Sequence, residues 1–423
     1  MSIKALKGFK DIVPGEVETW QFIEKTARDV FHCFDLTEIK VPILEKTELF
    51  TRSIGETTDI VEKEMYTFID RNGSSLTMRP EGTASVLRAY IENGLLAKKA
   101  VQKLYTIGPM FRHERPQKGR LRQFHQMSIE VLGSDHPRVD AELMAMASLI
   151  LKKLGLSASL EINSLGCPQC RPAFNAALLD FLHQAENLCD DCRRRRETNP
   201  LRVLDCKSSH CQEQYQHAPS ILDFLCPGCT SHFSEVKEGL DLLAIPYRIN
   251  SFMVRGLDYY TRTTFELVTS DLGAQSAIGA GGRYDGLVKQ LGGADVPGIG
   301  FAMGMERLAL LLEQQQKAVA APALDLFIVA LGPAAQKKGF ALTHALRQKS
   351  LIVSMDYQDR SLKNQMKQAG KAAARFVLIM GDEELVRGEA VLRNMESSEQ
   401  STLAIAAEAY AWAVELADII SKK

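Results

Sequence analysis

The sequence contains no apolar segment long enough to cross a membrane, because none of its 423 residues fall in a run of 18 apolar residues. Its first residues, MSIKALKGFKDIVPGE, lack the apolar core that a secretory signal peptide requires. We therefore expect a cytoplasmic protein that has no membrane partner.

The sequence also lacks an excess of charge of one sign and the two common nucleotide-binding loops. The net charge is −1, so any contact with nucleic acid must use local basic patches. No GxxxxGK[ST] motif occurs, and no GxGxxG motif opens a helix after a strand. The glycines of GAGGRYDG resemble a phosphate-binding loop only loosely, and tight strand packing explains them equally well.

The length exceeds that of one hydrophobic core and predicts two or three domains. A linker, QQQKAVAAPA, separates residues 1–322 from 323–423. The C-terminal segment contains the apolar strands LDLFIVAL, LIVSMDY and RFVLIMG between helical stretches, which is typical of a small α/β domain.

The N-terminal segment mixes helices and strands, which predicts an α+β domain. Apolar spacing predicts a helix over 17–34, and TEIKVPIL reads as a strand that contains Pro42. We further expect a hairpin around an Asn-Gly turn, a helix, two strands joined by a basic loop, and an amphipathic helix, over 65–80, 82–92, 103–133 and 140–155.

Nine cysteines are present, and eight of them lie between residues 167 and 229. Cys33 stands alone and is expected to be a buried free thiol. The others form CPQC, CDDC, CKSSHC and CPGC, a pattern that favours metal ligands over disulfides in a reducing compartment. Two zinc sites of four cysteines each and eight reduced thiols both remain open. The nearby RRRR of 193–196 is either a solvated helix face or a contact for a nucleic-acid backbone.

Four patches concentrate polar groups where a core would need apolar ones. A single arginine on a strand is usually solvated, but the four patches together argue for one site. They are MRPEGT (78–83), FRHERPQKGRLRQFHQMSIE (111–130), RGLDYY (255–260) and GIGFAMGMERL (298–308).

With these patches at this spacing, the chain resembles the class II aminoacyl-tRNA synthetases, and specifically the histidyl-tRNA synthetase family. EIKVPILEKTELF is similar to the first, dimer-forming class II motif through Pro42. FRHERPQKGRLRQFHQ and GIGFAMGMERL resemble the second and third motifs. RGLDYYTRTTFE and GAGGRYDGL resemble the two histidine-specific signatures.

The resemblance implies a fold and an activity. The fold is an α+β catalytic domain at 1–322, an antiparallel sheet flanked by helices, which a helical cysteine-rich insert interrupts at 168–248. An α/β anticodon-binding domain follows at 323–423. The activity is that of an ATP-dependent ligase, which makes histidyl-adenylate and transfers histidine to the 3′ end of tRNA(His). Mg²⁺ would bridge the ATP phosphates, and the enzyme would be a homodimer.

The chemistry of activation explains why arginines recur in the patches. A carboxylate attacks the α-phosphorus of ATP, so two anions must be brought together and the charge on phosphorus stabilised. A guanidinium suits this task because its donors bind phosphate in pairs. The resemblance implies that Arg112 and Arg255 are catalytic, and that Arg112, Glu114 and Arg307 bind ATP.

The amino-acid pocket must satisfy a neutral imidazole, which carries one donor and one acceptor. The resemblance implies that Glu130 and Tyr260 make this pair, and that Tyr259 and Tyr284 line the pocket. It assigns the α-ammonium to Glu81, Thr83 and Gln126, and it includes Gly82 among the histidine-binding residues. Arg115 and Gln117 of the basic loop would approach the tRNA acceptor end, including the extra 5′ guanosine of tRNA(His).

Two alternatives remain at this point. The first is the histidine-sensing regulatory subunit of ATP phosphoribosyltransferase, a binding protein that shares the catalytic fold but generally lacks the anticodon-binding domain. The second is a class II synthetase for proline, threonine or glycine, which RGLDYY argues against.

Overall fold

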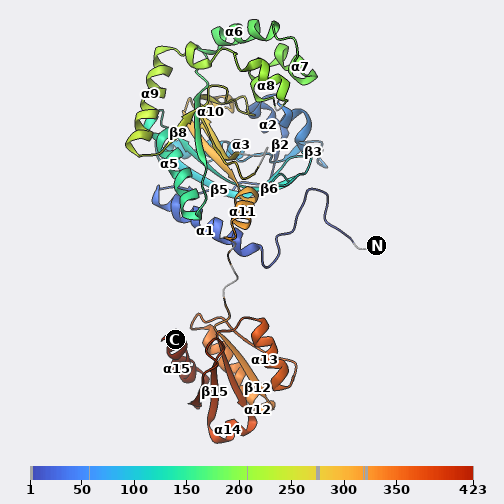
Figure 1. Ribbon diagram of the computed structural model, residues 1–423, viewed down its shortest axis with the longest axis vertical. Helices are drawn as coiled ribbons and strands as arrows, with labels where there is room; N and C mark the ends of the chain where they lie inside the picture. The colour runs from blue at the N-terminus through green and yellow to red at the C-terminus, as the bar shows by residue number, and fades with distance from the viewer. Residues whose placement is uncertain are drawn as a thin grey trace. The chain divides into compact units, whose positions relative to one another are not determined.

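The computed structural model describes residues 3–56, 58–206, 208–272, 277–317, 319 and 323–422. The chain divides into two compact units between residues 319 and 320, and we describe each unit by itself (Figure 1).

The first unit is built on a sheet of eight strands among the described residues. Neighbouring strands run antiparallel except at the two edges, where β1 pairs with β5 and β7 with β8 in parallel. This arrangement confirms the predicted α+β fold. From edge to edge the strands are β1 (Thr37–Glu38), β5 (Gln102–Phe111), β6 (Gln123–Leu132), β11 (Gly298–Gly304), β10 (Ala277–Arg283), β9 (Thr261–Val268), β7 (Ser159–Ser164) and β8 (Tyr247–Ile249).

The two faces of this sheet have different tasks. On β6, Met127, Ile129 and Val131 point into the main hydrophobic core because alternate residues of a strand face the same side. Four helices contribute to that core: α1 (Val17–Cys33), α5 (Pro137–Leu154), α9 (Pro227–Leu242) and α11 (Met305–Gln314). The intervening β6 residues face the opposite side, on which the site described below is built.

A small second sheet precedes β5. It consists of β2 (Leu44–Lys46), β4 (Ser75–Met78) and β3 (Tyr66–Ile69), and β3 and β4 form the predicted hairpin. Around it lie α2 (Thr47–Ile54), the π-helix η1 (Ile60–Glu64), α3 (Thr83–Glu92) and α4 (Leu95–Lys98). The prediction of a single strand over 37–44, across Pro42, is wrong. The chain leaves the large sheet after β1 and joins the small one at β2, because proline has no N–H to continue a ladder.

A helical insert lies between β7 and β8, with a hydrophobic core of its own. It contains α6 (Arg171–His183), α7 (Asp190–Thr198), η2 (Pro200–Asp205), α8 (Ser209–Tyr215) and η3 (Ile221–Phe224), and α9 returns the chain to the main core. Figure 1 shows α6, α7 and α8 grouped apart from α1 and α11. A short helix, α10 (Leu287–Gln290), follows β10.

Two sequence expectations about exposure need correction. Cys33 is a free thiol but is exposed, because it occupies the solvent side at the end of α1. The RRRR segment is more than a solvated face: Arg195 forms an ion pair with Asp59 at 2.9 Å, and Arg194 approaches Glu62 at 3.6 Å. The insert is thereby tied to the first part of the chain.

The second unit contains the three predicted apolar strands in one mixed sheet. Its order is β13 (Val353–Met355), β12 (Leu326–Leu331), β14 (Phe376–Gly381), β15 (Glu389–Asn394) and β16 (Gln400–Ala404), and its first three strands are parallel. The β15–β16 pair is an antiparallel addition that the sequence did not predict. The helices are α12 (Pro333–Arg347), α13 (Leu362–Lys371), α14 (Asp382–Arg387) and α15 (Ala409–Lys422).

Candidate active site

A cavity of about 300 Å³ opens on the face of the large sheet away from the main core. Its wall comes from segments that lie far apart in sequence, and all four polar patches contribute to it. Eleven of the fourteen predicted site residues line it: Glu81, Gly82, Thr83, Arg112, Glu114, Gln126, Arg255, Tyr259, Tyr260, Tyr284 and Arg307.

Three predicted site residues are not in the wall. Glu130 lies one layer behind it, where its carboxylate is covered by Thr83 and Tyr284. Arg115 and Gln117 are exposed in the loop between β5 and β6. The backbone of this loop is closed by paired hydrogen bonds between Gln117 and Arg120 of 3.0 and 2.9 Å, so its tip is available to a large partner.

The floor of the cavity is nearly free of side chains. Gly300, Ala302 and Gly304 alternate along β11 in the cavity wall, so a ligand can approach the strand backbone. Gly300 also has a steric reason: a Cβ at this position would collide with the Glu130 carboxylate and the Ile129 carbonyl. The glycines therefore serve strand packing and room for Glu130, and no phosphate-binding loop is needed to explain them.

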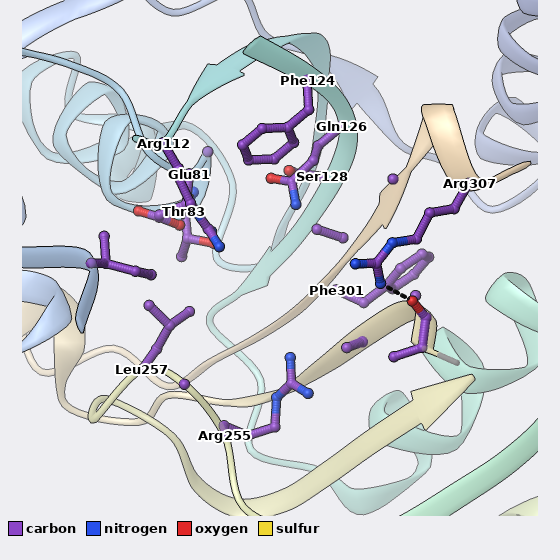
Figure 2. A pocket seen from close by; sticks show the side chains of 18 of the residues that line it. Glu81, Thr83, Arg112, Phe124, Gln126, Ser128, Arg255, Leu257, Phe301 and Arg307 are labelled. Carbon is purple, nitrogen blue, oxygen red and sulfur yellow. Dashed lines mark hydrogen bonds between the residues drawn. The ribbon is translucent and has the colours of Figure 1, made fainter. Parts of the chain in front are cut away.

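Four arginines line the cavity; Arg120 pairs with Glu114 at 2.8 Å, and the other three, Arg112, Arg255 and Arg307, come from different elements. Figure 2 shows Arg112 near Glu81 and Thr83, and Arg255 and Arg307 on other sides of the same space. Each guanidinium is held at one end. Arg112 donates from Nε to the Pro80 carbonyl at 2.8 Å, and Arg307 donates from Nε to the Gly119 carbonyl at 3.3 Å and from Nη1 to the Ala277 carbonyl.

Arg255 is the most deeply set of the three. Its Nη1 is paired with the Glu266 carboxylate, and its guanidinium lies over the Tyr260 ring at 5.5 Å. Its Nε is buried and has no hydrogen-bond partner among the described residues. A buried donor without a partner is costly, so this N–H is suited to an anionic ligand in the cavity.

Glu81 in the wall and Glu130 directly behind it supply two buried carboxyls. Thr83 donates its hydroxyl to Glu130 at 2.7 Å, and the Tyr284 hydroxyl also donates to Glu130. Glu81 accepts the backbone N–H groups of Thr83 and Ala84 at 2.7 and 2.8 Å. Burial raises the pKa of Glu130 to about 8 and also raises the pKa of Glu81. Among the described residues neither carboxyl forms an ion pair, although Arg112 lies near Glu81. Both carboxyls are therefore suited to a cationic or N–H donor ligand.

Three tyrosine rings close this end. Tyr259 contacts the rings of Tyr260 and Tyr284, with centroids 4.7 and 5.8 Å apart. Burial raises the pKa of all three phenols, so they are neutral hydroxyls at physiological pH. A neutral phenol can both donate and accept, as recognition of an imidazole requires.

Several residues of the wall were missed by the sequence reasoning. Phe124 precedes Gln126 and Ser128 on the same side of β6, and the Arg112 guanidinium lies over its ring at 5.3 Å. Glu306 accepts the His125 N–H with both carboxylate oxygens at 2.9 and 3.0 Å, which joins the start of α11 to β6. The alternation along FHQMS was the signal that could have identified Phe124 and Ser128.

One signature residue lies outside the cavity. Arg283 of GAGGRYDG is fully buried and pairs with Asp140 of α5 at 2.5 Å, and Asp140 also contacts His232 of α9 at 2.8 Å. This buried group joins β10, α5 and the helix that ends the insert. Arg283 therefore contributes to the framework of the site and does not touch the cavity.

Comparison with known proteins gives the family of the chain. A family model described as histidyl-tRNA synthetase matches residues 8–167 and 210–308, and one described as anticodon-binding domain matches 325–411. The histidine–tRNA ligase of Desulfotalea psychrophila is 61% identical over 96% of this chain and 95% of its own length.

The chain belongs to the histidyl-tRNA synthetase family. The histidine–tRNA ligase of Geobacter sulfurreducens, 58% identical, covers 94% of this chain and 96% of its own length. The solved structure of apo histidyl-tRNA synthetase from S. aureus superposes with a TM-score of 0.82 at 36% identity, covering 100% of this chain and 99% of that one. The match of full-length relatives favours the ligase over the regulatory subunit of ATP phosphoribosyltransferase. It also agrees with the class II fold.

Proposed function

We propose how the cavity performs the reaction of a histidine–tRNA ligase, the activity of this family. The chain activates L-histidine with ATP and transfers it to the 3′ end of tRNA(His). The observation that carries the proposal is the polarity of one cavity: Arg112, Arg255 and Arg307 surround it, and the buried carboxyls of Glu81 and Glu130 lie where three tyrosines close it.

ATP occupies the part of the cavity between Arg112, Arg255 and Arg307. Arg112 and Arg255 grip the α-phosphate from two sides, and Arg307 meets the rest of the nucleotide with Glu114. The free Nε of Arg255 supports its role, because it offers a donor where negative charge develops on phosphorus. Phe124 provides a flat surface for a purine. Mg²⁺ would enter with ATP as part of the substrate and would offset the negative charge of its phosphates.

Histidine occupies the carboxyl end. Glu81, Thr83 and Gln126, around Gly82, receive its α-ammonium, and its carboxylate points toward Arg255. Glu130 accepts the imidazole N–H in exchange for one of the two hydroxyls that now bond to it, and Tyr260 donates to the other ring nitrogen. A wrong amino acid would leave these buried groups unpaired, which costs several kcal/mol.

The tRNA meets two regions of the chain. The exposed Arg115 and Gln117 of the β5–β6 loop support a contact with the acceptor end, since arginine binds phosphate and an amide can read a base edge. The second unit, which matches an anticodon-binding domain, binds the anticodon.

We also propose a homodimer in the cytoplasm. Exposed apolar side chains gather on the segment similar to the dimer-forming motif and on the neighbouring hairpin: Ile43, Leu44, Phe68 and Ile69 are each at least 41% exposed. Such a cluster supports a second copy covering it. Among the described helices, none has the length and apolarity to cross a bilayer.

Aminoacylation with purified tRNA tests this function. We expect the chain to load histidine onto tRNA(His) but not onto a tRNA for another amino acid, and to require ATP and Mg²⁺. Gln117→Ala should weaken charging without slowing ATP–pyrophosphate exchange, because Gln117 is exposed and does not line the cavity. The proposal would be contradicted if histidine were loaded at equal rates onto tRNA(His) and onto a tRNA for another amino acid.

A further inference from the structure

The eight cysteines of the insert meet as two groups of four. One group is Cys167, Cys170, Cys226 and Cys229; the other is Cys189, Cys192, Cys206 and Cys211. Within each group all four Sγ atoms lie within 4.8 Å of one another. The first group combines cysteines from the two ends of the insert, and all four cysteines of the second group lie between them in the sequence.

The sulfur separations match a single tetrahedral ion. Sγ of Cys167 lies 3.7 Å from that of Cys170 and 3.9 Å from that of Cys226, and Sγ of Cys189 lies 3.8 Å from that of Cys206. Four Zn–S bonds of about 2.3 Å in a regular tetrahedron place the sulfurs about 3.8 Å apart. A disulfide would require about 2.05 Å.

We propose that each group binds one Zn²⁺ ion through four thiolates, and that the two ions hold the histidine-binding loop 255–260 in place. Four sulfur ligands in a tetrahedron select zinc among the available divalent ions, and closed sites of this kind are structural. The groups are partly or fully buried, which excludes water from the ligands.

Backbone N–H groups stabilise thiolates in both groups. The N–H of Cys226 points to Sγ of Cys170, and the N–H of Cys189 points to Sγ of Cys211, both at 3.2 Å. Four thiolates and one Zn²⁺ carry two net negative charges, which such donors offset. Each group therefore has a backbone N–H that is placed to stabilise a metal-bound thiolate.

The first group is joined to the histidine loop by the next residue in the chain. Arg171, which follows Cys170 at the start of α6, donates from Nη2 to the Tyr260 carbonyl and from Nε to the Leu165 carbonyl at 3.4 Å. The backbone of Gly166, beside Cys167, accepts the Arg262 N–H at 2.9 Å. An ion in the first group therefore fixes the C-terminal end of the loop.

The second group reaches the other end of the loop. Arg202, in η2 between Cys192 and Cys206, is buried and donates from Nη1 to the Arg255 carbonyl at 2.8 Å. It also lies 3.7 Å from Asp59. Residues 253–260 have no helix or strand, so these two arginines substitute for regular structure. This coupling rests on the proposed role of the loop, whereas the metal sites do not.

Metal analysis of the full chain tests the sites directly. The protein is expressed in zinc-supplemented medium, passed through a column with a weak chelator and measured for zinc and iron by mass spectrometry. We expect two zinc ions per chain, one in each of Cys192→Ser and Cys229→Ser, and two in Cys33→Ser, whose thiol is exposed and outside both groups.

Zinc replaced by Co²⁺ should give the visible absorption of a tetrahedral tetrathiolate site, which keeps the test decisive even if a serine variant fails to fold. If the wild-type chain binds only one ion, the serine variant that still binds this ion identifies the group that holds no metal, and the assignment of that group is overturned. Zinc well below one per chain, or iron in its place, overturns both.

Steady-state pyrophosphate exchange tests the coupling. Arg171→Ala and Arg202→Ala should keep both zinc ions but raise the histidine KM about tenfold or more, with the ATP KM changed less than about twofold. Arg248→Ala, an exposed arginine on β8, is the control and should match wild type. Two zinc ions with unchanged histidine KM in both variants would overturn the coupling alone. An inactive wild-type chain with two zinc ions would instead overturn the proposed function.

Discussion

Replacing Glu130 by glutamine should change how the stability of the first unit depends on pH. Burial raises the pKa of this carboxyl from 4.5 to about 8. Ionising it in the folded state therefore costs roughly 5 kcal/mol more than in the unfolded chain, as an upper limit. The folded state binds the extra proton between these two pKa values, so the stability of the wild type falls as pH rises from about 4.5 to about 8.

Glutamine cannot ionise, so the variant lacks this loss. At pH 5 the variant should be less stable by about 1 kcal/mol, because the amide nitrogen cannot accept one of the hydroxyls of Thr83 and Tyr284. At pH 9 the order should reverse, and the variant should be the more stable by a few kcal/mol. The two curves should therefore cross between these pH values.

Tryptophan fluorescence can follow the first unit alone. The chain has two tryptophans, Trp20 in α1 and Trp412 in α15. With Trp412→Phe in every protein, Trp20 reports urea unfolding of the first unit from pH 5 to 9. Glu92→Gln, at an exposed carboxyl of α3, is the matched control and should stay parallel to wild type. A Glu130→Gln curve that also stays parallel would refute the buried-carboxyl reasoning.

Three further changes test the site. Arg255→Ala should lower histidine activation at least about 10²-fold with folding intact, because a transition-state donor is lost; near wild-type exchange would remove its role. Gly300→Ala should cost about 1–3 kcal/mol and raise the histidine KM, because its Cβ would displace Glu130. Gly304→Ala, whose Cβ meets no atom within 4 Å, is its stability control, and equal unfolding of both variants would contradict the steric argument. A chain ending at residue 322 should still activate histidine but charge tRNA poorly through a higher tRNA KM, since a remote contact is removed. Full charging by this shortened chain would show that the second unit does not bind the anticodon.

Local patterns in the sequence predicted much of the fold. The apolar spacing of 17–34 and the alternation of 122–133 depend only on near neighbours, and α1 and β6 follow them closely. The split at Pro42 was harder to predict, because the choice between two sheets depends on β4 and β5, which come later in the chain.

Long-range pairs could not be predicted from spacing. Asp140 meets Arg283 across 143 residues, and Arg195 meets Asp59 across 136. The cysteine pairs could combine in several ways, and only the fold brings 167 and 170 to 226 and 229. The cavity residues were found because family motifs carry such distant contacts in their spacing, whereas Phe124 and Ser128 depend on strand alternation alone.

ATP–pyrophosphate exchange, measured separately with each of the twenty amino acids, tests most directly that the cavity activates histidine. We expect rapid exchange with histidine alone, and its loss in Arg255→Ala. Exchange with another amino acid at a comparable rate would contradict the assignment of the tyrosine–carboxyl pocket to an imidazole. No exchange with any amino acid, in a chain that still binds histidine, would contradict the enzyme and favour a histidine-sensing protein.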